Sequence, residues 1–203
     1  MSAMNNNISF VADTFNNGNT SIYLASQKDN LKAQNIQIDS CVFTDFRASA
    51  AVVNDIENMM FRFNKLMSHA NDFIADATQF YNISGVSEIG ANEIVLSNST
   101  SKIRNAIVVR NASFEDINPL SIVNNSISLT GTTKASKTYG IDVDSSNFVN
   151  IYYNTILINI ASSNTSSRNL FVGKANTNVV VRNNNLDNQC GGYAYYVEGD
   201  GSQ

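Results

Sequence analysis

The sequence predicts an all-β protein, a right-handed parallel β-helix solenoid of about eight coils. Two observations predict this fold. Short stretches with alternating apolar residues recur from one end of the chain to the other, and a second set of short apolar stretches alternates with the first. Alternation with a period of two is typical of a half-buried strand. A repeat of roughly 20 to 30 residues is typical of the coils of a solenoid.

The first set of stretches shares one pattern: an apolar residue, any residue, a second apolar residue, and another apolar residue five positions after the second. Ile36, Ile38 and Phe43 show this pattern. Alternation places the first two apolar side chains of each copy on one face of a strand. The copies lie at residues 8–10, 36–38, 59–61, 81–83, 107–109, 127–129, 149–151 and 179–181.

The second set of apolar stretches follows the first, in most cases about 13 to 16 residues later. Its members lie at residues 22–24, 51–53, 73–75, 94–96, 120–122, 141–143, 170–172 and 195–197. One strand from each set per coil, stacked at the ~4.8 Å spacing of paired strands, builds two parallel sheets on opposite sides of one apolar core. We therefore expect a single domain over residues 1–203.

An asparagine stands two positions before the Leu or Ile that ends several copies of the first set, at Asn64, Asn154 and Asn184. This ending resembles the repeat of the pectin-lyase-like superfamily of right-handed parallel β-helices. The resemblance implies that these asparagines stack as a ladder at a tight turn, where asparagine tolerates a left-handed backbone. Because other coils have a different residue at this place, we expect a partial ladder, interrupted at Asp13, Cys41 and Ala112.

The composition argues against several classes of function. Charged residues make up 15% of the chain and the net charge is −4, without a cluster of Lys and Arg, so the footprint of a nucleic-acid binder is missing. No apolar run approaches the ~20 residues that cross a membrane. His69 is the only histidine, so a His-based triad or a His-rich metal site would depend on it. Cys41 and Cys190 lie several coils apart, and we expect two free thiols.

Outward-facing residues of successive coils form columns, and enzymes of the superfamily usually have their sites on such an outer face. In the column of the second set, Asp144 and Glu198 lie two coils apart, roughly 9.6 Å by strand spacing, near the outer limit for the carboxylates of an inverting glycosidase. Asp142 also projects outward, and Asp142 and Asp144 offer oxygen ligands for a Ca²⁺ ion. Solvation of the sheet face is the alternative role of these acids.

The column of the first set contains Arg62, Arg110, Tyr152 and Arg182. An arginine there is suited to stabilise a developing enolate or to bind a uronate carboxylate through two hydrogen bonds. Asp144, Glu198 and Arg110 are therefore the candidate catalytic residues. Arg62, Tyr152 and Arg182 are the candidate carbohydrate-binding residues, with the tyrosine ring as a platform for a sugar. Packing of the arginine stems on neighbouring coils is the structural alternative.

The resemblance and the polar, weakly charged outer face lead us to expect a secreted or cell-surface protein that contacts a polysaccharide or surface glycan. No catalysis is assigned, because the only proline, Pro119, has no flanking arginine as in the Arg-x-Pro-x-x-Arg motif of pectate lyases, and the polygalacturonase segments are missing. The first alternative is a polysaccharide lyase or glycoside hydrolase that acts on the outer face. The second is a structural adhesin or spike module.

The repeat leaves strands at both ends of the predicted solenoid without a cap. Exposed strand edges invite association, and solenoid ends need polar caps to stay soluble. We therefore expect a fragment of a longer chain, or ends that are covered by neighbouring domains or by the other chains of a homotrimer. The first ten residues have neither the basic nor the apolar region of a signal peptide.

Overall fold

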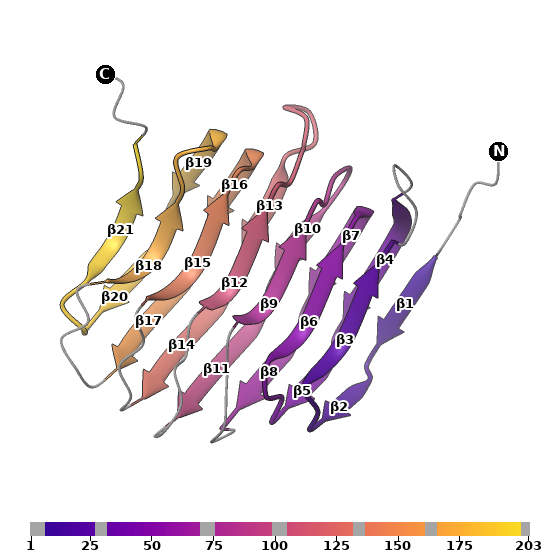
Figure 1. Cartoon of the computed structure of the whole chain (residues 1–203), viewed down its shortest axis with the longest axis horizontal. Coiled ribbons are helices and arrows are strands. Elements are labelled where there is room, and N and C mark those ends of the chain that lie inside the picture. The colour runs from indigo at the N-terminus through magenta and orange to yellow at the C-terminus, as the bar shows by residue number, and fades with distance from the viewer. Residues whose placement is uncertain are drawn as a thin grey trace.

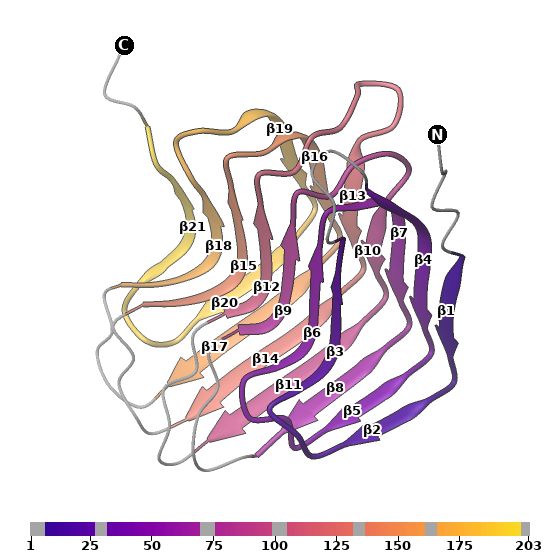
Figure 2. The same ribbon diagram turned by 45° about the vertical axis from the view of Figure 1, so that its right-hand side comes forward.

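The computed structural model describes residues 7–26, 32–69, 76–98, 105–131, 137–160 and 166–199. These residues form a parallel β-helix in which three sheets of seven strands each surround one core. Figure 1 shows the strands stacked along the long axis of the molecule, from the N-terminal coil at one end to the C-terminal coil at the other. Figure 2 brings the N-terminal coil forward, and its strands lie on three sides of the core.

Each coil gives one strand to each sheet, and all strand pairs within the sheets are parallel. Sheet A contains β1 (Ile8–Val11), β4 (Ala33–Asp39), β7 (Ile56–Arg62), β10 (Glu88–Gly90), β13 (Leu120–Val123), β16 (Asn147–Tyr152) and β19 (Thr177–Arg182). Sheet B contains β2 (Thr14–Asn16), β5 (Val42–Thr44), β8 (Lys65–Ser68), β11 (Glu93–Asn98), β14 (Ser126–Gly131), β17 (Thr155–Ile160) and β20 (Asn185–Asn188). Sheet C contains β3 (Thr20–Ala25), β6 (Ser49–Asn54), β9 (Asp76–Tyr81), β12 (Asn105–Arg110), β15 (Thr138–Asp144), β18 (Ser167–Val172) and β21 (Tyr193–Val197).

The predicted all-β solenoid is confirmed, but two of its details were wrong. The described strands form seven coils, or about six full turns, rather than eight coils, and each coil has three strands where two were expected. The strands of sheet B follow those of sheet A after a turn of two residues, as between β1 and β2. The turn shifts the alternation by one residue, so that the inward Phe43 follows the inward Ile38 after five positions. The predicted pattern therefore counted the two strands as one element.

Because the prediction had two strands per coil instead of three, it assigned several apolar stretches in the middle of the chain to the wrong sheet. Of the first set, residues 107–109 lie in β12 of sheet C, residues 127–129 lie in β14 of sheet B, and residues 81–83 begin at the end of β9. Of the second set, residues 94–96 lie in β11 of sheet B and residues 120–122 in β13 of sheet A. The stretch at residues 73–75 lies outside the described residues.

The core is a continuous column of apolar side chains from all three sheets. In the N-terminal half, aromatic rings meet in the core. Phe15 and Phe43 of successive coils are nearly parallel with centroids 4.9 Å apart, and Phe61 meets Phe80 of the same coil edge to face at 5.4 Å. In the C-terminal half, buried isoleucine, leucine and valine take over, including Ile151 at 0% exposure. Burying this surface is the main favourable term for the fold.

A ladder of five asparagines runs inside the turn between sheets A and B, formed by Asn64, Asn92, Asn125, Asn154 and Asn184. The backbone N–H and the side-chain amide of each rung donate to the Oδ1 atom of the next rung, at 2.9 to 3.1 Å. The amide of each rung also donates to a carbonyl of the preceding coil. The buried polar groups of the turn thereby find partners inside the protein.

The left-handed backbone of this turn belongs to the residue before each rung, not to the rung itself. Phe63, Ala91, Asn124, Tyr153 and Asn183 have φ between 53° and 56°. Cys41 and Asp13 hold the rung position in the first two coils, as expected, and the Cys41 N–H donates to Asn64 Oδ1 at 2.9 Å. The placement of Ala112 in this ladder was wrong. Its N–H donates to Ser146 Oγ at a different turn, which follows sheet C.

Both cysteines are free and buried. Across the described part of the chain, no helix has the length and apolar character that crossing a membrane requires.

Candidate functional site

The outer face of sheet C has a pocket over β12, β15 and β18. Strand register aligns its residues in columns that run along the solenoid. One column contains Val108, Asp142 and Phe171 on successive strands. The neighbouring column contains Tyr81, Arg110 and Asp144 on successive strands, followed by Gly173 and Glu198 just beyond the ends of β18 and β21.

Asp142 is the most unusual residue of this face. It projects outward and yet is only 1% exposed, because neighbouring side chains cover it. Its Oδ2 atom forms an ion pair with Arg110 Nη2, while its Oδ1 atom is buried without a hydrogen-bond partner among the described residues. A buried acceptor without a donor costs free energy unless the group is protonated or binds a ligand.

The environment of Asp142 favours the neutral acid. Burial raises the pKa of Asp142 to about 7, and the negative charges of Asp76 and Asp144 act in the same direction. The guanidinium of Arg110 opposes this rise. Near neutral pH the side chain is therefore divided between its acid and carboxylate forms, in contrast to an ordinary surface aspartate.

Arg110 joins the two aspartates of β15. Its Nη1 atom lies 3.4 Å from Asp144 Oδ2, and its Nη2 atom contacts Asp142. Asp144 has 34% of its side chain exposed and also accepts a hydrogen bond from the N–H of Ser145 at 2.9 Å. One guanidinium thus faces two carboxyl groups, one buried and one open to solvent.

The position of the Asp144 carboxylate depends on Gly173, the residue next to it on the following coil. A Cβ atom at Gly173 would overlap the Asp144 carboxylate, so the absence of a side chain there lets the carboxylate lie over the next strand, toward Glu198. Asp144 and Glu198 are two coils apart, as the sequence predicted. The spacing of paired strands puts their backbones roughly 9.6 Å from each other.

Aromatic rings form the second wall of the pocket. Tyr139 and Phe171 stack with centroids 4.8 Å apart and an interplanar angle of 6°, and Tyr196 continues the stack at 5.9 Å from Phe171. Arg168 lies over this group, with its guanidinium carbon 4.3 Å from the Tyr196 centroid and 5.1 Å from that of Tyr193. Burial raises the pKa of Tyr139 above its usual value, so its hydroxyl stays protonated.

The pocket enclosed by these groups has a volume of about 310 Å³. This volume is at the lower end of the range for small-molecule sites. Its lining combines carboxylates, cations, an amide and two rings: Asn105, Arg110, Lys137, Tyr139, Asp142, Asp144, Phe171 and Glu198.

The structure brings together four of the predicted site residues: Asp142, Asp144, Glu198 and Arg110 all line this one pocket. Arg110 was placed in the wrong column, since it belongs to β12 of sheet C. Sequence reasoning missed Lys137, Tyr139 and Phe171. Strict alternation from the inward Ile141 and Val143 would place Tyr139 in the core, so the sequence carried no signal that Tyr139 and Phe171 share an outer wall.

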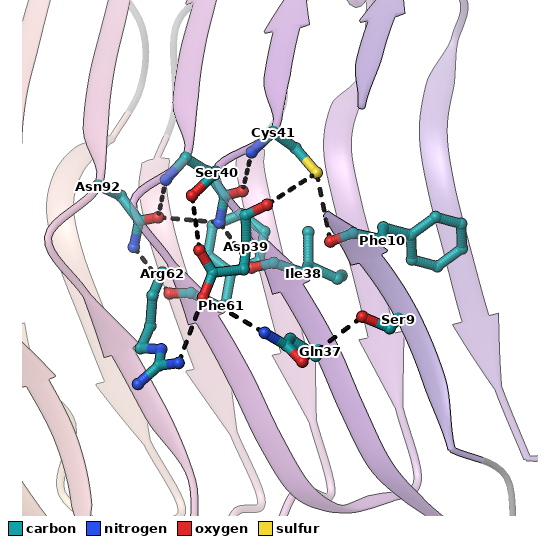
Figure 3. A network of polar contacts seen from close by, with 11 residues as sticks. Ser9, Phe10, Gln37, Ile38, Asp39, Ser40, Cys41, Phe61, Arg62 and Asn92 are labelled. Carbon is teal, nitrogen blue, oxygen red and sulfur yellow. Dashed lines mark hydrogen bonds and ion pairs between the residues drawn. The ribbon is translucent and has the colours of Figure 1, made fainter. Parts of the chain in front are cut away.

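The predicted carbohydrate-binding residues lie elsewhere, on the outer face of sheet A. Arg62, Tyr152 and Arg182 share one column there, but Arg62 is separated from Tyr152 by two intervening strands. Arg62 forms an ion pair with Asp39 at 3.2 Å, inside the polar network of Figure 3. Tyr152 donates to Asn150 Oδ1 at 3.0 Å, and Arg182 is its neighbour on β19.

The predicted Ca²⁺ ligands, Asp142 and Asp144, both have Arg110 as their counter-ion. Within the described residues, no three His, Cys, Asp or Glu side chains cluster in a way that would hold a metal ion. A hard cation prefers six or more oxygen ligands, and two carboxyl groups that share a guanidinium do not supply them.

A second hollow, of about 430 Å³, lies beside the turn that leads into β10 and includes Glu57, Ser84 and Glu115. Its polar groups have partners in the protein: Glu57 accepts from Gln34, and Lys32 donates to Ser84. It holds no buried group comparable to Asp142, so the pocket of sheet C is the stronger candidate.

Comparisons with protein-family models, with curated protein sequences and with solved structures found no match to this chain. The parallel β-helix fold therefore stands on the structure itself, and the resemblance to the pectin-lyase-like superfamily stays an expectation.

Proposed function

We propose that the pocket on the outer face of sheet C binds a carbohydrate. The observation that carries this proposal is the combination, in one hollow of about 310 Å³, of exposed hydrogen-bonding charges with the stacked rings of Tyr139 and Phe171. Binding sites for small polar ligands join an apolar wall with a few converging polar groups. A sugar ring has both an apolar face and a rim of hydroxyl groups, and it suits such a lining.

The groups of the pocket divide the work of recognition. Asp144 and Glu198 accept hydrogen bonds from sugar hydroxyls, and Lys137 donates to ring or hydroxyl oxygens. Arg110 is held by Asp142 and Asp144, so it presents a fixed face rather than a mobile charge. Because acidic and basic groups are mixed, we expect neutral sugars and mixed-charge glycans to bind better than highly anionic ones.

A glycan array with the purified chain tests this proposal. Asp144→Asn and Glu198→Gln remove acceptor charge from the pocket, and we expect each to lower binding of any glycan bound by the unaltered chain by about tenfold. Glu93→Gln is the matched control, because Glu93 lies on sheet B and pairs with Lys65 at the surface. Binding that is equal in all four proteins would contradict the assignment of the pocket.

A second candidate function is cleavage of a polysaccharide at the same place. It is favoured by the presence of an acid whose pKa is raised to about 7, Asp142, beside Asp144 and Glu198. Glycosidases combine a carboxylic acid of raised pKa with an ionised carboxylate. Release of reducing sugars, or absorbance from an unsaturated product, measured against neutral and uronate glycans, tests this candidate. Activity that survives Asp144→Asn would exclude Asp144 as a catalytic residue.

Two further parts of the proposal concern the superfamily to which the fold is related and the location of the protein in the cell. We propose that the β-helix is related to the pectin-lyase-like superfamily, on the strength of its asparagine ladder, and that the protein works outside the cell or at its surface, where glycans are found. Fractionation of the source cells with an antibody against the chain tests the second part. Signal confined to the cytosolic fraction would contradict it.

A further inference from the structure

A lysine and a serine form a close pair at the second hollow, away from the pocket of sheet C. The Lys32 Nζ atom lies 2.9 Å from the Ser84 Oγ atom and reaches it across one intervening coil. An amine within hydrogen-bond distance of a hydroxyl is the arrangement of a general base and its nucleophile. A serine paired with a lysine is one of the variants of the catalytic serine triad. The pair therefore has the spacing that activation of the serine requires.

The surroundings of Lys32 weaken its charged form. Among the described residues, no carboxylate forms an ion pair with its Nζ atom. Burial lowers the pKa of Lys32 below its ordinary value of 10.5, and the negative charges of Asp55 and Glu57 oppose this decrease. The Glu57 carboxylate is itself held by Gln34, whose amide donates to its Oε2 atom at 2.8 Å. A partly desolvated lysine supplies a neutral amine more readily than a surface lysine does, and a general base must be neutral.

The backbone holds Ser84 at the wall of the second hollow, which has a volume of about 430 Å³. The Ser84 N–H donates to the carbonyl of Ile56, and the Ser84 carbonyl accepts from the N–H of Asn58, each at 3.0 Å. Both partners belong to the preceding coil, so the serine is fixed in the stack of the solenoid. The volume is within the range of small-molecule sites. The hydroxyl of Ser84 thus has a defined position beside a space that can hold a ligand.

The residue after Ser84 offers a hydrogen-bond donor. Gly85 has a φ of 70°, and a Cβ atom there would overlap the side chain of Asn58, so only glycine fits without a shift. Asn58 Oδ1 accepts from the N–H of Val86 at 2.9 Å and fixes this turn. No acceptor for the N–H of Gly85 is found among the described residues. The backbone N–H that follows a nucleophilic serine is a usual part of an oxyanion hole.

We infer that Ser84 and Lys32 form a catalytic dyad that hydrolyses uncharged esters of short acyl chains. The lining of the hollow favours this class of substrate. Glu57 and Glu115 disfavour anionic substrates, and the apolar side chain of Phe114 suits an acyl chain. This inference does not depend on the carbohydrate proposal, because none of these residues lines the pocket of sheet C.

The reaction has two steps. In the first, the neutral Lys32 amine takes the hydroxyl proton of Ser84 while Oγ forms a bond to the carbonyl carbon of the ester, and the Gly85 N–H donates to the resulting oxyanion. The bond to the alcohol oxygen then breaks, and the Lys32 ammonium gives the proton to the leaving alkoxide. In the second step water attacks the acyl group on Ser84, and Lys32 accepts its proton. The carboxylic acid leaves as Lys32 returns that proton to the serine oxygen.

A fluorophosphonate, which phosphonylates activated serines with loss of fluoride, tests the dyad on the full chain. We expect labelling at Ser84, located by mass spectrometry of peptides, and loss of this label in Ser84→Ala. Lys32→Arg keeps a cation and hydrogen-bond donors at this place, but a guanidinium does not give up its proton. A structural contact would survive this change, whereas base catalysis would not. We therefore expect Lys32→Arg to lower the rate of labelling by about 100-fold or more.

Ser128→Ala and Lys65→Arg are the matched controls, and both should be labelled like the unaltered chain. Ser128 is half-buried on the outer face of sheet B, and Lys65 pairs with Glu93 at the surface. Far-UV circular dichroism verifies that each variant is folded.

Hydrolysis of p-nitrophenyl acetate gives a second readout with the same variants. We expect the part of the rate that depends on Ser84 to rise with pH and to level off below the ordinary lysine value of 10.5, because Lys32 must lose its proton first. An unaltered chain that is not labelled, a label on the neighbouring Ser113 instead of Ser84, or a Lys32→Arg variant that reacts at the full rate would overturn the inference.

Discussion

Arg110 and Asp142 form an ion pair across two adjacent strands in which the carboxylate is almost completely buried, at 1% exposure, while 28% of the arginine side chain is open to solvent. Desolvation weakens the charged form of a buried carboxyl group more than one partner restores it. The pair therefore holds an acid that titrates near neutral pH on the outer face of a β-helix, where ordinary aspartates are ionised.

The first prediction concerns the pH dependence of stability. Burial raises the pKa of Asp142 from 3.8 to about 7, so between these values the folded state binds more protons than the unfolded chain. Stability must then fall as the pH rises through this window, and it levels off above it. The full effect of this one group is on the order of 4 kcal/mol.

Urea unfolding of the unaltered chain and of Asp142→Asn from about pH 4 to about pH 8 measures this effect. The difference between the two curves isolates Asp142 from the other carboxyl groups, and we expect the variant to gain stability relative to the unaltered chain as the pH rises. Two parallel curves would show that Asp142 titrates normally.

The second prediction concerns Arg110. Among the described residues, Arg110 is the one cation paired with the buried carboxyl group of Asp142. Arg110→Met removes it, and breaking a buried pair typically costs 3–5 kcal/mol. We expect a loss of about this size at pH 8 and a smaller loss at pH 5, where Asp142 is already neutral. Arg62→Met is the control, since its partner Asp39 is more exposed. An equal loss at both pH values would mean that packing of the arginine stem, not charge, carries the effect.

The third prediction concerns the asparagine ladder. Asn154 is 0% exposed and makes hydrogen bonds with both neighbouring rungs, so Asn154→Ala leaves several buried groups without partners. We expect a loss of about 2–4 kcal/mol in the free energy of unfolding. Asn184→Ala, at the last rung, should cost about half as much or less. Equal losses at the two positions would argue that the ladder is not cooperative along the solenoid.

The fourth prediction concerns the left-handed turn residues. Tyr153 has a φ of 56° and is 58% exposed, and this backbone conformation costs an ordinary residue roughly 1 kcal/mol. Tyr153→Asn should therefore raise the free energy of unfolding by about 0.5–1 kcal/mol, since asparagine tolerates the conformation. Tyr152→Asn is the matched control, with the same change at a neighbouring strand residue, and should lower it. Thermal unfolding of both variants makes the comparison, and a stabilised Tyr152→Asn would contradict the explanation.

The parallel β-helix could be predicted from the sequence because apolar and polar residues alternate within the strands and this pattern recurs from coil to coil. Inward pairs such as Ile36 and Ile38 in β4 or Val149 and Ile151 in β16 are buried in the core, as alternation predicts. In the middle of the chain, the prediction assigned several apolar stretches to the wrong sheet, and the cause is the unequal length of the coils. Successive ladder rungs are separated by 23, 28, 33, 29 and 30 residues, because loops absorb insertions without disturbing the stack.

The candidate site was predictable only in part. Asp144 and Glu198 were placed two coils apart correctly, because the phase holds at both positions. Arg110 was assigned to the wrong sheet, because a copy of the pattern at residues 107–109 looks the same in sheet A and in sheet C. The burial of Asp142 depends on side chains of neighbouring coils, and alternation alone says only that it points outward.

Hydrogen–deuterium exchange with and without a glycan identified on the array tests the central claim most directly, because it locates the contact on the solenoid. We expect protection in peptides that cover residues 137–144, which include β15, and residues 167–173, which include β18. We expect no change on the outer face of sheet A around Arg62, Tyr152 and Arg182. Protection confined to sheet A, or none at saturating glycan, would contradict the assignment of the pocket beside Asp142 as the binding site.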